Sequence, residues 1–120
     1  MPASASVAPG AVIQLRQAPD NMACDTIGVD YRQVTFRIDP AAAEQVSALA
    51  DTGAALRTFW SADFRGGPGG DRVVLDAAGA VVAGDGEVLV INPPDARPRL
   101  HGHFVCPAPD ALYILAEDPT

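Results

Sequence analysis

The chain has 120 residues, 48% of them hydrophobic, and a net charge of −7 at pH 7. This length fits one domain with one core, and the hydrophobic content excludes wholesale disorder. No apolar run reaches the about 18 residues that a transmembrane helix requires. All the basic residues are arginines, and the sequence pI is near 4.4. Phosphate groups would repel such an acidic chain, which excludes nucleic acid and anionic membrane surfaces as favoured partners.

The N-terminus predicts a flexible lead-in over residues 1–18, followed by a single β domain over residues 19–120. The lead-in lacks the basic start and the uninterrupted apolar stretch of a signal peptide, because Pro9 and Gly10 break it. A start of this kind is also what remains when a signal or a lipid-anchor segment has been removed, so the sequence leaves export open. Within the lead-in, Val12–Leu15 is a candidate for a first edge strand.

The next elements are extended. In 34–38, apolar residues alternate with Thr35 and Arg37, which predicts a half-buried strand. Residues 40–50 are ambiguous. Asp39 as N-cap and Pro40 at the first helical position favour a short helix, whereas 46–50 followed by Asp-Thr-Gly favours a hairpin. In either case we expect 56–60 to be a strand that delivers the only tryptophan to the core or its rim.

The second half predicts further strands separated by glycine-rich and proline-rich segments. The segment 66–70 is expected to be a flexible connector. The run 72–91 contains three short apolar stretches cut by turns at Gly79, Gly84 and Gly86, the pattern of a β-meander. Residues 92–98 predict a stiff extended loop, and 100–106 and 111–116 two more strands.

These elements sum to six to eight strands and at most one short helix. No crossover helices are available for a parallel α/β fold. We therefore expect a mainly β fold, either a small antiparallel barrel or a two-sheet sandwich, since both protect sheet edges.

One region resembles a known group of proteins. An aromatic-rich strand in 59–64, the Gly/Pro loop and a D-x-x-G-x-x-V-A-x-x-G pattern beginning at Asp76 are similar to small, uncharacterised bacterial secreted or lipoprotein domains. Such domains are thought to resemble OB-like barrels. The resemblance covers about 30 residues and implies a barrel and export, but it assigns no catalytic residue.

Cys24 and Cys106 are the only cysteines. If they pair, the bridge closes most of the chain into one loop, which the chain-entropy treatment associates with about 4 to 5 kcal/mol of stability. The alternative is two buried, reduced thiols, which are normal in a cytosolic protein. We favour the bridge, and with it an extracellular or cell-envelope location over a cytoplasmic one.

His101 and His103 are the only histidines, and in one continuous strand their i, i+2 spacing places both rings on one face. A metal could use this pair with a third ligand from Asp76, Asp85 or Glu87. We favour two ordinary exposed histidines, and we read the acidic residues as turn formers rather than as a calcium site. No cofactor is expected.

No catalytic motif stands out, because neither Ser47 nor Ser61 lies in a nucleophile elbow. The first hypothesis is therefore a non-enzymatic, exported β-barrel module that binds an unknown protein or small molecule, or serves as a structural unit. The alternative is a small metal-binding protein or metal-dependent enzyme that uses the two histidines. A third hypothesis is a homo-oligomer formed through exposed edge strands. The candidate binding rim comprises Gly66, Gly67, Gly69, Asp71, Asn92, Asp95 and Arg97.

Overall fold

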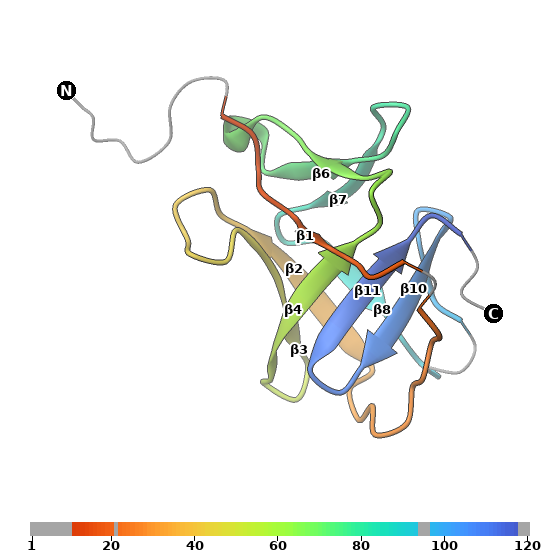
Figure 1. The fold of residues 1–120 in the computed structure, drawn as a ribbon. Helices are drawn as coiled ribbons and strands as arrows, with labels where there is room; N and C mark the ends of the chain where they lie inside the picture. Colours follow the sequence, from red (N-terminus) through yellow and green to blue (C-terminus); the bar gives the residue numbers. More distant parts are fainter. Residues whose placement is uncertain (1–10, 21, 94–96, 118–120) are drawn as a thin grey trace.

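The computed structural model describes residues 11–20, 22–93 and 97–117, and it is mainly β (Figure 1). One sheet has the strand order β8-β2-β3-β4-β11-β10-β9, with β1 added to β4, and is nearly closed like a barrel. A second sheet has the order β5-β6-β7.

The bounds of the strands are β1 (Arg16–Gln17), β2 (Gln33–Ile38), β3 (Val46–Ala50), β4 (Ala55–Trp60), β5 (Arg65–Gly66), β6 (Val73–Leu75), β7 (Val81–Gly84), β8 (Val88–Val90), β9 (Arg99–Leu100), β10 (His103–Ala108) and β11 (Ala111–Leu115). A single-turn 3-10 helix, η2 (Gly69–Asp71), precedes β6. In the described part of the chain, three strands have only two residues, and the eight longer ones agree with the predicted six to eight.

The alternation of apolar residues explains β2 and β3. In β2, Val34, Phe36 and Ile38 are buried and their neighbours are exposed or half-buried, which confirms the predicted strand. In β3 the buried positions also alternate, and this strand lies between β2 and β4. The predicted hairpin is therefore confirmed, and the predicted helix over 40–50 is wrong. Asp39 does not cap a helix, because its carboxylate accepts the N–H of Ala41 within a turn.

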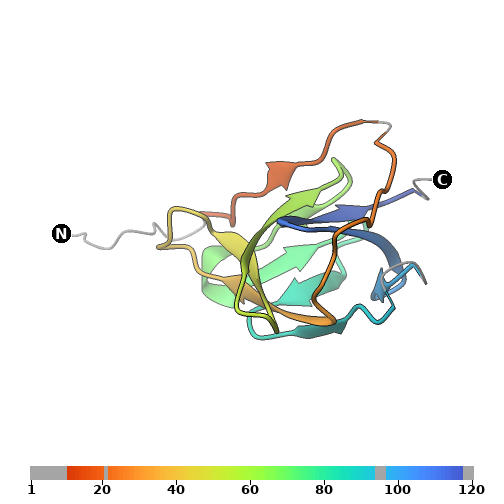
Figure 2. The ribbon, with the colours of Figure 1, turned by 90° about the horizontal axis from the view of Figure 1, so that it is seen from below.

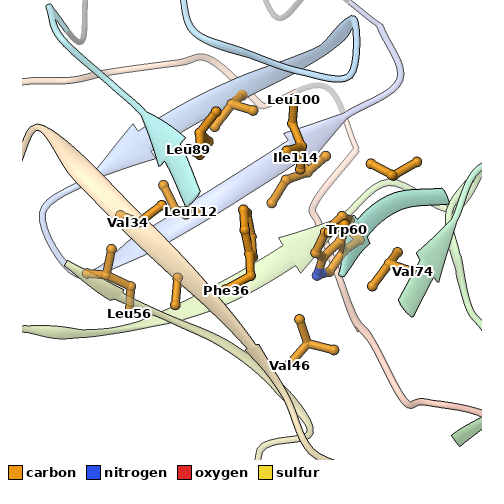
Figure 3. Close-up of a cluster of buried hydrophobic side chains, with 14 of the residues drawn as sticks. Val34, Phe36, Val46, Leu56, Trp60, Val74, Leu89, Leu100, Leu112 and Ile114 are labelled. Carbon is orange, nitrogen blue, oxygen red and sulfur yellow. The ribbon is translucent and has the colours of Figure 1, made fainter. Parts of the chain in front are cut away.

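The main core is centred on Trp60, whose side chain is 1% exposed (Figure 3). Its ring packs at 6.2 Å from Phe36 and at 5.8 Å from Phe64, measured between centroids. The indole N–H donates to the hydroxyl of Thr58 at 3.0 Å, and this hydroxyl donates to the carbonyl of Val46. The prediction that β4 delivers Trp60 to the core is confirmed, and both buried polar groups are satisfied.

The predicted three-stranded meander is only partly correct. β6 and β7 form the expected antiparallel hairpin, but β8 leaves β7 and pairs with β2. The carboxylate of Asp85 accepts the N–H of Ile38, and the carbonyl of Glu87 accepts the N–H of Phe36. These hydrogen bonds direct the chain after β7 to the large sheet, so the turn residues were identified correctly and the partner of the third strand was not.

Two strand pairs are parallel, in contrast to the expected antiparallel barrel. β11 pairs with β4, and the short β1 pairs with the other side of β4. The connection from β4 to β11 contains the small sheet, β8, β9 and β10. It is long enough to return the chain in the same direction without a crossover helix. Within the described ranges, no helix is long and apolar enough to cross a membrane.

Residues 11–18 pack on the fold, so the predicted lead-in boundary at residue 18 is wrong for this part. Ile13 is 2% exposed, and Ala18 is also buried. Val12 makes only an isolated bridge to Pro68, and the first strand lies slightly later, at β1. Figure 1 shows this segment crossing the sheet in front of β4 and β11.

Candidate functional site

Cys24 and Cys106 form the predicted disulfide, which links the segment before β2 to β10. The structure contains no free cysteine among the described residues. Cys106 points to the outer side of the barrel, where it is 1% exposed because Ala18, Met22 and Cys24 pack against it. We call the described residues 18–20 and 22–24 the strap. The N–H of Ala18 donates to the carbonyl of Trp60 at 2.8 Å, so a backbone bond and a covalent bond hold the two ends of the strap.

A second apolar cluster, which was not predicted from the sequence, lies under the strap and outside the barrel. Phe59 and Tyr113 stack at 5.0 Å between ring centroids, and the guanidinium of Arg99 lies 4.1 Å from the ring centre of Phe104. Phe59, Tyr113 and Phe104 occupy the outward phase of β4, β11 and β10. One sequence signal could have revealed this cluster: its aromatic residues alternate with the core positions of their strands and so lie on the opposite side. The cluster consists of Ala18, Cys106 and Leu115, with half-buried Met22, Cys24, Phe59, Phe104 and Tyr113 around them.

The first half of the predicted rim is an ordered internal segment. Gly66 lies in β5, where an added Cβ would be only 1.8 Å from the carbonyl oxygen of Ile13. The carbonyl of Gly67 accepts the N–H of Ile13, and the N–H of Gly69 donates to the carbonyl of Ala11. Both Gly67 and Gly69 are buried, whereas Asp71 is exposed at the end of η2. The prediction of a flexible connector is therefore wrong. The glycines of this segment instead let its backbone pack closely against residues 11–13.

The second half of the predicted rim lies elsewhere. The amide oxygen of Asn92 accepts a hydrogen bond from Arg32 at 3.0 Å. Arg97 is exposed, and Asp95 lies outside the described residues. Figures 1 and 2 show the green segment 66–71 and the blue-green segment that follows β8 on opposite sides of the molecule. The structure does not bring the two halves of the candidate rim together.

The two histidines do not share one face of a strand. His101 and Gly102 form the turn between β9 and β10, both with positive φ, so the predicted continuous strand 100–106 is a hairpin. The Nε2 atom of His101 lies 2.5 Å from a carboxylate oxygen of Glu87. His103 begins β10, with its Nε2 atom 3.6 Å from Asp76. Each histidine thus contacts one of the acidic residues that were candidates for the third ligand of a metal ion.

These acidic residues have structural partners. The carboxylate of Asp76 accepts the N–H groups of Ala78 and Ala80, and the bond from Ala80 is the main reason that the pKa of Asp76 is lower than its ordinary value. Glu87 also accepts the N–H of Gly84, and Asp85 orients β2 as described above. The interpretation as turn formers is consistent with these bonds. Among the residues described, no three or more His, Cys, Asp or Glu side chains come together as a potential metal site.

The outer face of β3, β2 and β8 exposes large apolar side chains. Leu49, Val88 and Val90 are 44%, 49% and 62% exposed. Thr35 of β2 is the register partner of both Leu49 and Val88, so the three side chains form one row across three strands. We call Leu49, Thr35, Val88 and Val90 the apolar row. Contiguous apolar groups on a surface are typical of contact sites.

Comparison with known proteins identifies no relative whose function could be transferred to this chain. No protein-family model matches the chain, and no curated protein and no solved structure matches it significantly.

Proposed function

We propose that this chain is an exported, non-enzymatic β-barrel module of OB-like type that acts by binding a partner. The disulfide carries this proposal. Cys24 and Cys106 bridge most of the chain length, and the bridge holds the strap over the outer cluster. Such bridges form and persist in extracellular and cell-envelope compartments and are rare in the cytosol.

The roles of the acidic side chains support a non-enzymatic module. Asp39, Asp51 and Asp76 accept backbone N–H groups, and Glu44 forms an ion pair with Arg16 at 2.6 Å. A general acid or base needs a carboxylate directed toward a bound reactant. These carboxylates instead close turns and connect segments of the fold.

The apolar row supports a binding role. Its leucine and valines lie on regular strands, so the surface is rigid before any partner arrives, which lowers the entropic cost of association. A protein partner fits this surface better than a small molecule does, because the row is spread over three strands.

The experiment is thiol trapping on protein directed to the bacterial periplasm by an added cleavable signal. The folded protein is alkylated under denaturing, non-reducing conditions, and its intact mass is measured. We expect no alkylation without reductant and two alkylated cysteines after reduction. The double variant Cys24→Ala/Cys106→Ala is the blank. Two alkylated thiols in the unreduced, folded protein would contradict the proposal.

The metal-binding alternative rests on the contacts of His101 with Glu87 and of His103 with Asp76. These are two separate pairs, each of which lacks the third protein ligand that structural and catalytic zinc sites use. The alternative is therefore the weaker candidate, and metal analysis tests it directly.

A further inference from the structure

The outer face of β2, β3 and β4 carries a row of polar residues beside the apolar row. Arg37 of β2 is the register partner of Ser47 in β3, and Ser47 is the register partner of Arg57 in β4. All three alternate with buried core residues, so their side chains point outward, where both arginines are exposed and Ser47 is half-buried. We call Arg37, Ser47 and Arg57 the cationic row.

The two guanidinium groups of this row have no partner in the fold. Within the described ranges, neither forms an ion pair or a hydrogen bond through its side chain. Arg57 acts on Glu44 only through its charge, because both oxygens of that carboxylate are held by Arg16, at 2.6 and 2.8 Å. Acidic residues outnumber arginines in the chain by 15 to 8, and yet these two arginines on one face are left for an external anion.

The cationic row and the apolar row lie next to each other along the strands. Leu49 is two residues from Ser47 in β3, and Thr35 is two residues from Arg37 in β2. Residues i and i+2 of a strand are about 7 Å apart on the same face, which is also the spacing of side chains on one face of an extended partner. One strand separates Arg37 from Arg57, so their Cα atoms are about 10 Å apart. A single partner segment can therefore reach both rows.

We propose that these two rows together bind a protein segment that presents carboxylates beside apolar side chains of leucine or valine size. The carboxylates pair with Arg37 and Arg57, and the apolar groups cover Leu49 and Val88. The inference rests on the proposed binding role, and it names the surface and the chemistry of the partner.

Charge and polarity favour this occupant over others. A guanidinium pairs with a carboxylate through two parallel hydrogen bonds, as Arg16 does with Glu44 in this protein. A free phosphate or sulfate ion would use the arginines but would leave the apolar row in water. A long polyanion would extend beyond the cationic row, and a chain with a net charge of −7 would repel it there. A short segment that is both acidic and apolar matches the two rows at once.

Fluorescence anisotropy of labelled synthetic peptides, titrated with the full chain, tests the proposal. The probe is Glu-Ser-Leu-Ser-Glu-Ser-Leu, in which one face of the extended peptide alternates glutamate and leucine. One control peptide has lysine in place of glutamate, and the other has serine in place of leucine. We expect the probe to bind with a Kd below about 1 mM, and each control peptide to bind at least about tenfold more weakly.

Two variants of the protein test the two rows separately. Arg37→Ala/Arg57→Ala should raise the Kd of the probe about tenfold, because both charged pairs are lost. Arg65→Glu is its control, since Arg65 is exposed on the small sheet and the net charge changes by the same amount. Leu49→Ser should raise the Kd at least about threefold, whereas Ile27→Ser, at a position that is 82% exposed in a turn, should leave it unchanged.

The fluorescence of Trp60 verifies that each variant is folded. Failure of the probe to bind at about 1 mM protein would overturn the inference. Equal binding of the probe and either control peptide would also overturn it, as would equal weakening by Arg37→Ala/Arg57→Ala and Arg65→Glu. Thiol trapping does not depend on peptide binding, so a protected disulfide without binding of the probe separates this failure from failure of the export proposal.

Discussion

Replacing both cysteines by alanine, in the variant Cys24→Ala/Cys106→Ala, should destabilise the fold strongly. The two residues are 82 positions apart. For a loop of this length, the chain-entropy relation gives a loss of about 4.5 kcal/mol at 25 °C, because the uncrosslinked chain has more unfolded conformations. A 120-residue protein has an unfolding entropy near 0.25 kcal/mol/K at its midpoint, so the same loss lowers Tm by about 18 °C.

Urea unfolding followed by the fluorescence of Trp60 measures this effect, because the only tryptophan is buried in the folded state. The m-value should rise in the variant, since the denatured chain becomes more expanded. Wild-type protein unfolded with reductant is the control, because it breaks the bridge and keeps both sulfur atoms. A loss below about 1 kcal/mol in both samples would refute the reasoning, as the bridge would then not restrict the denatured chain.

Three further predictions concern the internal glycine segment, a buried tyrosine and the histidines. Gly66→Ala should lower the free energy of unfolding, measured in urea, by about 3 kcal/mol or more, because the new Cβ would overlap a backbone carbonyl. Gly70→Ala is the control: its Cβ would meet open space, and the free energy of unfolding should change by less than about 0.5 kcal/mol. Burial raises the pKa of Tyr31 above its ordinary value. The stability that Tyr31 contributes is therefore complete below about pH 10 and is lost as pH rises further, and Tyr31→Phe should flatten this decline in thermal unfolding. Untagged protein should bind no stoichiometric zinc by elemental analysis after dialysis. A stoichiometric metal that is lost in His101→Ala/His103→Ala would instead establish the metal-binding alternative.

Local patterns predicted the elements whose burial alternates along the chain. The apolar phase of β2 and the placement of Trp60 in β4 needed only nearest neighbours in sequence. The cysteine pair was also predicted, from its number and position. Residues 40–50 were ambiguous because alanine favours helix, and the strand β3 forms only because β2 and β4 provide partners on both sides.

Local sequence patterns could not predict which strands pair over long distances in the chain. The turns around 79–86 were visible as glycines, yet nothing local indicates that β8 pairs with β2 rather than with β7. The same problem affected the histidines. Alternating apolar residues in 100–106 imitate one strand, but the positive φ values of His101 and Gly102 reverse the chain. The His-Gly pair was the available signal, since two-residue hairpin turns favour glycine at a position with positive φ.

The reversal at His101 also explains how the barrel is nearly closed without a continuous set of backbone hydrogen bonds. Glu87 immediately precedes β8 and His101 immediately follows β9, so their 2.5 Å contact joins the two ends of the large sheet through side chains. Inside the barrel, Leu89 of β8 and Leu100 of β9 belong to the same core cluster (Figure 3). Because side chains make this closure, the backbone groups of Val88 and Val90 are not used in it. A side-chain contact and shared core packing therefore take the place of a backbone ladder between β8 and β9.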